Sequence, residues 1–267
     1  MSATASLRRV GAMTLRHFYL LRSSWPRVVS LMYWPIVQMT MWGFLTVYLQ
    51  ETDGWAGQAF GLLLGGVLLW DVCFRSQISL SIAFLEEMWS RNLGHLFASP
   101  LRPWEWAAAM ISTAAMRAAI GALPAMALCI PLFGFSIFEL GWALVAFFLQ
   151  LAIFGWALSL LVISIIFRHG MGADELAWAA IFLIAPFSCI YYPVSVLPDF
   201  LVPIALALPA THVFEGMRAA LNDGAFDGSA MRAALVLNLI WLAAGLIIFL
   251  RACAAARANG WVLQQGE

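Results

Sequence analysis

The chain has 267 residues, of which 63% are hydrophobic and only 10% are charged, and its mean hydropathy is +0.88. A soluble domain carries about a quarter charged residues, so this composition indicates an integral membrane protein. All 14 basic residues are arginine, which excludes a P-loop nucleotide site and a Schiff-base or lysine-nucleophile enzyme, because each of these needs a lysine.

Residues 1–27 precede the first long apolar stretch and carry five arginines. On a helix over residues 6–25, apolar side chains that include Leu7 and Leu21 fall on one face, and Arg8 and Arg16 fall largely opposite. Such a helix lies in the membrane interface, with its arginines near anionic lipid headgroups. The sequence therefore predicts an amphipathic N-terminal interface helix, which either anchors the chain and sets its topology or docks a partner.

Six apolar stretches follow that are long enough to cross a bilayer, since a spanning helix takes about 20 residues. They cover residues 28–50, 57–84, 104–132, 139–167, 173–192 and 231–251. Most arginines outside these stretches lie on one side, which the positive-inside rule makes cytoplasmic. The expected fold is one all-α integral membrane domain over residues 1–267, with six transmembrane helices and both termini in the cytoplasm.

Charged residues occur inside two of these stretches, where a charge at the bilayer centre costs about 2.5–3.5 kcal/mol on the insertion scale. Asp71 and Arg75 are i,i+4 neighbours in the second stretch, and Arg117 lies in the third. Counted from the cytoplasmic turn at 1.5 Å per residue, Asp71 and Arg117 are both about 21–22 Å deep. We therefore predict an Asp71–Arg117 contact, which either fixes the helix register or lines a substrate path or gate.

Residues 86–103 form a short polar helix-turn between the second and third stretches, on the predicted cytoplasmic side. Its apolar Leu93, Leu96 and Phe97 are suited to a groove of a soluble partner, with Arg91 and Arg102 on the rim. The alternative is an interfacial loop that has no partner.

Residues 193–226 are too apolar for a solvated loop and too interrupted by proline for a straight helix. Short helices that dip back into the outer leaflet fit this pattern, because irregular backbone at that depth must be packed in protein or line a cavity. Five deep aromatic residues are candidates to line a path for a sugar or an amphiphile: Trp34, Trp42, Tyr48, Tyr191 and Tyr192. The four histidines lack metal-ligand spacing, so no metal site is predicted.

Two motifs resemble those of the ABC-2-type (type-2 exporter) ABC transporter permeases. In that family the first cytoplasmic loop has an acidic residue at the end of span two and then the pattern Gly-(T)-Leu-(E)-x-Leu-x-x-(S/T)-Pro-Leu. This chain has Glu86-Glu87 and then Gly94-His95-Leu96-Phe97-Ala98-Ser99-Pro100-Leu101. The family's outer element has P-x-x-x-L-P and a later Pro segment with E-x-x-R, matched here by Pro193, Pro198, Pro209, Glu215 and Arg218. His95 replaces the usual small polar residue, which bears on the choice of ATPase.

The resemblance implies a transport subunit and no enzyme, with ATP and Mg bound by a partner and no cofactor on this chain. Two such permeases, as a homodimer or a heterodimer, would bind a dimer of ABC ATPase subunits in a bacterial inner membrane. They would export an amphiphilic, lipid-linked or glycan-type substrate, with membrane lipids and no nucleic acid as further partners. The implied ATPase-coupling residues are Glu86, Glu87, Arg91, Leu93, Gly94, His95, Leu96, Phe97, Pro100 and Arg102.

Two other classes remain as alternatives. A secondary transporter usually has paired broken helices in two repeats, whereas the proline breaks here occur once. An intramembrane serine protease needs a serine in a G-x-S-x-G setting and a histidine on another span. Ser159 lacks the flanking glycine pattern, and no histidine lies inside a predicted span.

Overall fold

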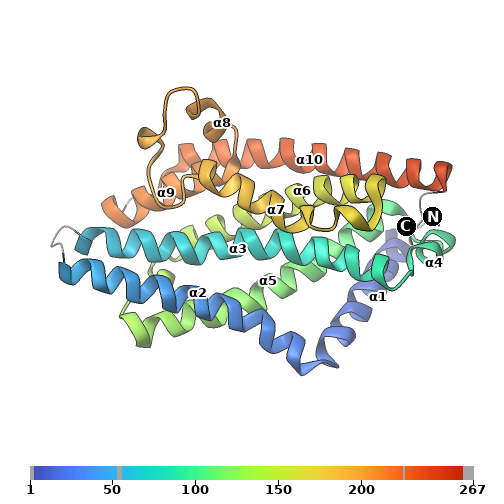
Figure 1. Cartoon of the computed structure of the whole chain (residues 1–267), viewed down its shortest axis with the longest axis horizontal. Helices are drawn as coiled ribbons and strands as arrows, with labels where there is room; N and C mark the ends of the chain where they lie inside the picture. The colour runs from blue at the N-terminus through green and yellow to red at the C-terminus, as the bar shows by residue number, and fades with distance from the viewer. Residues whose placement is uncertain (1–2, 53–55, 225, 261–267) are drawn as a thin grey trace.

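The computed structural model describes residues 3–52, 56–224 and 226–260, and helices dominate these residues. Its long helices run side by side along the length of the molecule, as Figure 1 shows. The α-helices are α1 (Ala3–Arg22), α2 (Trp25–Thr52), α3 (Ala56–Trp89), α4 (Leu93–Ala98), α5 (Pro103–Phe133), α6 (Trp142–His169), α7 (Leu176–Ile184), α8 (Val202–Leu206), α9 (Pro209–Asp223) and α10 (Gly228–Asn259). Four short 3-10 helices join them: η1 (Ile137–Leu140), η2 (Gly170–Ala173), η3 (Ala185–Ser188) and η4 (Val194–Val196).

Within the described residues, five helices are long and apolar enough to cross a membrane: α2, α3, α5, α6 and α10. They correspond to five of the six predicted spans, which confirms the prediction of an all-helical, multi-pass membrane protein. The prediction succeeded for these helices because each is a long apolar run, which hydropathy detects directly.

The sixth predicted span, residues 173–192, is not confirmed as a full-length crossing. Its helix begins only at Leu176, after η2, and ends in η3 and the left-handed Cys189, whose φ is 52°. Pro186 contributes to this ending, since proline lacks the N–H that a continuing helix needs. The apolar helix over Leu176–Ser188 is about 20 Å long, shorter than the hydrocarbon core of a bilayer.

Helix α3 lies in the interior of the bundle and contacts α2, α5, α6, α7 and α9. In its most apolar window 89% of residues are buried, against 17% in α2 and 22% in α10. Helix α6 approaches α3 closely at Gly155, where an added Cβ would lie 2.6 Å from the carbonyl oxygen of Cys73. The absence of a side chain at this glycine therefore lets the two backbones touch.

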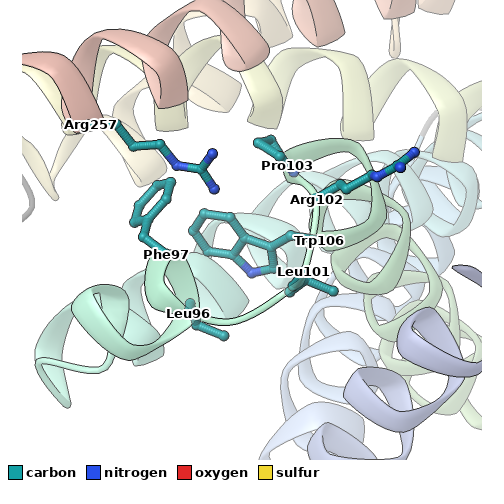
Figure 2. Close-up of a pocket in the computed structure, with 7 residues that line it drawn as sticks. All are labelled: Leu96, Phe97, Leu101, Arg102, Pro103, Trp106 and Arg257. Carbon is teal, nitrogen blue, oxygen red and sulfur yellow. The ribbon is translucent and has the colours of Figure 1, made fainter. Parts of the chain in front are cut away.

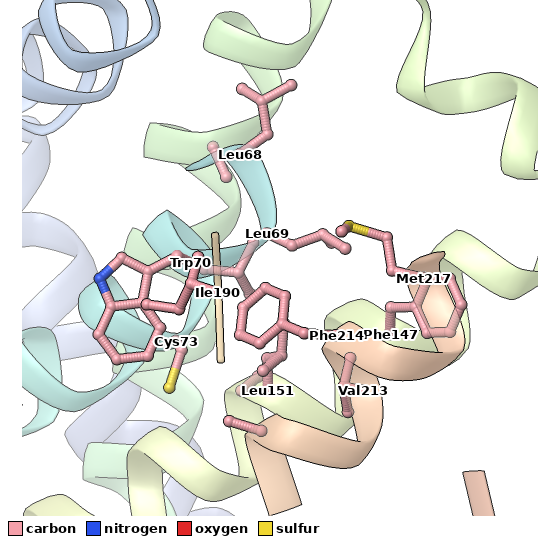
Figure 3. Packing of buried hydrophobic residues seen from close by; sticks show 14 of the residues in the cluster. Leu68, Leu69, Trp70, Cys73, Phe147, Leu151, Ile190, Val213, Phe214 and Met217 are labelled. Atoms are coloured by element: carbon pink, nitrogen blue, oxygen red, sulfur yellow. The ribbon is translucent and has the colours of Figure 1, made fainter. Parts of the chain in front are cut away.

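A hydrophobic cluster joins α3, α6 and α9 in the half of the bundle away from α4. Figure 3 shows Trp70 and Cys73 of α3 on one side of Phe214 of α9 and Phe147 of α6 on the other. Aromatic side chains of this size bury the most apolar area, so they fix the helices against one another.

The predicted broken outer element is present as η4, α8 and α9, at the end of the bundle opposite α4 (Figure 1). The Glu215 carboxylate accepts a hydrogen bond from the Val194 N–H at 2.9 Å, and the Arg218 guanidinium donates to the Cys189 carbonyl at 2.7 Å. Glu215 and Arg218 also form an ion pair at 3.0 Å. These two residues of the predicted motif thus hold the turns before η4 onto α9, while the depth of this element in a membrane stays a prediction.

Candidate coupling site and intramembrane cavity

The helix-turn predicted at residues 86–103 contains α4, which sits between the ends of α3 and α5. The chain leaves α3 through Arg91 with a φ of 54°, and Ser99 ends α4 by donating its N–H to the His95 carbonyl at 3.0 Å. Helix α5 then starts at Pro103, and Glu105 accepts a hydrogen bond from the Arg102 N–H at 3.0 Å, the geometry of a capping box. Both termini of the loop are therefore fixed to membrane-spanning helices.

The apolar side of α4 packs onto the protein itself. Leu93 is buried, and the half-buried Leu96 and Phe97 lie against an aromatic cluster that includes Trp106. The Arg257 guanidinium of α10 stacks over the Phe97 ring at 4.8 Å from its centroid, as Figure 2 shows. These apolar residues therefore pack against α5, α6 and α10 of this chain, and their contact with a partner's groove stays a prediction.

The other side of α4 is exposed and consists of Arg91, Gly94, His95 and Ala98, which we call the α4 face. Pro100 and Arg102 are also exposed beside it. A Cβ added at Gly94 would meet nothing within 4 Å, so the helix surface is flat and open at this point. The exposed Arg91 and Arg102 make this surface a candidate contact for a soluble subunit, because arginine is enriched in protein interfaces.

Two buried carboxylates hold the N-terminal helix α1 against this end of the bundle. Glu87 accepts hydrogen bonds from Arg16 and from Asn92, which precedes α4, and the His17 Nε2 lies 3.4 Å from its carboxylate. Glu105 accepts from the Arg9 Nε at 2.8 Å. Arg9 and Arg16 therefore bind protein carboxylates, and the position of α1 near lipid headgroups stays a prediction.

Sequence reasoning missed one of these carboxylates, Glu105, and the residues that surround the two: Arg9, Arg16, His17 and Asn92. The capping-box spacing of Arg102 and Glu105 was a usable signal for the start of α5. The pairings across α1 join segments far apart in the chain, so no local pattern reveals them.

The charged residues inside the predicted spans pair differently from the expectation. The Asp71–Arg75 pair is confirmed at 2.7 Å, whereas Arg117 pairs with Glu86 at 3.1 Å. The expected Asp71–Arg117 ion pair is absent among the described residues, so that prediction is wrong. Its error is one of register: an added Cβ at Gly121 would lie 2.8 Å from the Arg75 Cδ, so the Arg75 side chain lies beside α5 about one turn beyond Arg117.

A cavity of about 450 Å³ lies between α2, α3, α5 and α7. Its charged lining residues are Asp71, Arg75 and Arg117, all at least nine-tenths buried. Its aromatic lining residues are Trp34, Phe74, Trp178 and Phe182. Three of these four are well exposed at the protein surface, so the cavity is open on that side and charged at its base.

Only one of the five aromatic residues predicted to line a path, Trp34, lines this cavity. Trp42 stacks on Tyr191 with ring centroids 4.9 Å apart, and the Tyr192 hydroxyl donates to the Pro186 carbonyl. Tyr48 is exposed on α2. The Trp42–Tyr191 stack joins α2 to the loop before the outer element, a structural contact that the sequence did not indicate.

The fold and these sites define a multi-pass membrane protein with a charged internal cavity and a structured loop at one end. The family model of ABC-2 type transporters matches residues 10–222, which is most of the chain. The chain therefore belongs to the ABC-2 type transporter family and is a transmembrane permease component of an ABC transporter. Permeases of this family normally work with an ABC ATPase. A comparison with curated proteins gave no match.

Proposed function

We propose that this permease belongs to an ATP-driven exporter and that a separate ABC ATPase binds at the α4 face. In this proposal two permease subunits pair in a bacterial inner membrane, and they move an amphiphilic, lipid-linked or glycan-type substrate. ATP and Mg bind to the ATPase subunits. The observation that carries the proposal is a short helix that is fixed to three spanning helices on one side and bare on the other.

The contacts of α4 explain how movement of a bound ATPase would reach the membrane. Phe97 contacts Trp106 of α5 and Phe167 of α6, and Arg257 of α10 stacks over Phe97. A displacement of α4 therefore displaces the ends of several spanning helices together, a rigid-body transition of the hinge type.

A bulky side chain on the α4 face tests this proposal. Gly94→Trp places a large group on an open surface, so it leaves the fold intact and blocks a partner. The matched control is Gly228→Trp at the start of α10, where an added Cβ also meets nothing within 4 Å. We expect the co-expressed ATPase to co-purify with wild type and Gly228→Trp and to be lost from Gly94→Trp. Retention of the ATPase by both variants would contradict the assignment of the α4 face.

Dependence on ATP hydrolysis distinguishes the proposed function from the secondary-transporter alternative. We expect vanadate, or an ATPase subunit that cannot hydrolyse ATP, to abolish transport, and transport that persists would favour the alternative. The intramembrane-protease alternative has little support from the structure, since the Ser159 hydroxyl lies 2.7 Å from the Ser81 hydroxyl in a buried contact between α6 and α3.

A further inference from the structure

The cavity between α2, α3, α5 and α7 contains polar atoms that the protein leaves without a partner. Among the described residues, neither the Asp71 Oδ1 nor the Arg117 Nε has a hydrogen-bond partner, although both atoms are buried. An unsatisfied buried polar atom costs about 1–3 kcal/mol, so these two atoms favour a hydrogen-bonding group in the cavity. The volume of about 450 Å³ lies in the range of small-ligand pockets.

The charges around the base of this cavity leave one positive charge in excess. Asp71 is neutralised by Arg75 at 2.7 Å. Glu86, in contrast, is shared by two arginines, Arg117 at 3.1 Å and Arg27 at 3.6 Å. One carboxylate serves both guanidinium groups, so Arg117 can turn to an anion in the cavity while Glu86 keeps Arg27.

The aromatic side chains that line the cavity suit the apolar part of a ligand whose anionic part pairs with Arg117. The aromatic rings of Trp34, Trp178 and Phe182 stand at the exposed side of the cavity, whereas the charged groups lie at its base. A molecule with an acidic head and an apolar tail therefore matches the cavity from base to opening.

We propose that this cavity binds an amphiphile with a phosphate-type anionic head group. The head group replaces Glu86 as the ion-pair partner of Arg117. Phosphate oxygens accept hydrogen bonds from the Arg117 guanidinium, and a hydroxyl of the head group donates to the Asp71 Oδ1. Glu86 is followed in α3 by Glu87, which binds Asn92 at the start of α4. This inference rests on the proposed function and gives the chemical class of its substrate.

Binding is measured on the full chain in phosphatidylcholine nanodiscs, with radiolabelled dodecyl phosphate as the probe and empty nanodiscs as the blank. We expect saturable binding of dodecyl phosphate that unlabelled dodecyl maltoside, with its neutral head, does not displace. Arg117→Gln removes the guanidinium and is expected to weaken binding about tenfold or more. The matched control, Arg232→Gln, changes an exposed arginine at the start of α10 and leaves binding unchanged.

A second variant keeps the test valid if Arg117→Gln fails to fold. Glu86→Gln releases Arg117 from its partner, so it is expected to tighten dodecyl phosphate binding severalfold, a gain that a damaged fold does not produce. Displacement of the probe by dodecyl maltoside as readily as by unlabelled dodecyl phosphate, or weaker binding by Glu86→Gln, would overturn the proposal.

The same nanodiscs identify the source of the phosphate group. Added phosphatidylglycerol that displaces the probe identifies a membrane phospholipid, and a lack of displacement identifies a cargo with a different tail. The binding measurement needs no ATPase, and ATPase co-purification with Gly94→Trp needs no ligand. Failure of this inference and failure of the proposed function are therefore distinguishable.

Discussion

At the scale of single residues, Glu87 joins three segments on one carboxylate: α1 through Arg16, the end of α3, and the turn into α4 through Asn92. The side chain is 2% exposed, whereas that of Arg16 is 42% exposed. Loss of these hydrogen bonds would therefore cost more free energy at Glu87 than at Arg16, because a buried charge without partners is unfavourable and an exposed one is solvated by water.

We expect Glu87→Gln to lower the free energy of unfolding by about 1–3 kcal/mol, because the neutral amide keeps the shape but loses charge-assisted hydrogen bonds. The measurement is the thermal unfolding midpoint of the purified permease. Glu139→Gln, an exposed change at the other end of the bundle, serves as the control and should leave the midpoint unchanged. Equal midpoints for wild type and Glu87→Gln would show that Glu87 does not hold this end together.

Gly155 provides a second prediction at this scale. Gly155→Ala introduces a Cβ 2.6 Å from the Cys73 carbonyl oxygen and 2.9 Å from the Gln77 nitrogen, both backbone atoms that cannot move aside. We expect α3 and α6 to separate and stability to fall by about 1–3 kcal/mol, as in other overpacked cores. The unfolding midpoint measures this loss.

Gly11→Ala is the matched control, since Gly11 lies in α1 and its added Cβ meets nothing within 4 Å. It should be neutral or stabilising, because alanine favours a helix over glycine. A midpoint for Gly155→Ala at or above that of Gly11→Ala would refute the close approach of α3 and α6.

At the scale of elements, the sequence located α4 but not its orientation. The polar turn after a long apolar run is visible in residues 86–103, and so is the capping spacing at Arg102 and Glu105. The side of α4 that faces the protein depends on Trp106, Phe167 and Phe249, which come from three different helices. Such contacts between distant segments have no signature in the local sequence.

The contact between α4 and α10 is expected to contribute a measurable coupling energy. In a double-mutant cycle of Phe97→Ala and Arg257→Gln, we expect an interaction of about 0.5–2 kcal/mol, the range of cation–π pairs. The measurement is unfolding of the two single variants and the double variant. A cycle of Phe97→Ala with Arg251→Gln, an exposed arginine on the same helix, should give an interaction near zero. Additive effects in the first cycle would mean that Arg257 does not hold Phe97.

At the scale of the whole molecule, five of the six predicted crossings correspond to helices long and apolar enough to span a membrane, and the family match confirms the predicted class. The predicted span over residues 173–192 is too long because hydropathy measures how apolar a segment is, and not where 3-10 turns shorten its helix. The Asp71–Arg117 contact failed for a related reason. Depth counted along one helix gives no register between two helices, and here the packing at Gly121 sets that register.

The topology is testable with cysteine labelling, since all four native cysteines are buried and should react slowly. His95 lies on the α4 face, and Asn222 is exposed near the end of α9, at the opposite end of the bundle. With a membrane-impermeant maleimide, we expect His95→Cys to be labelled only in inside-out vesicles and Asn222→Cys only in intact cells. Wild type is the control for background, and labelling of both positions from one side would contradict the predicted orientation.

The length and burial of α3 have a mechanical consequence. This helix is about 50 Å long, leads directly into the α4 turn at one end, and packs against α9 near the other. A continuous helix that is enclosed by neighbouring helices has little room to bend, so a displacement at one end moves the whole helix. We therefore expect inward closing and outward opening in this transporter to be one concerted event, without a separate intermediate in which only one mouth has moved.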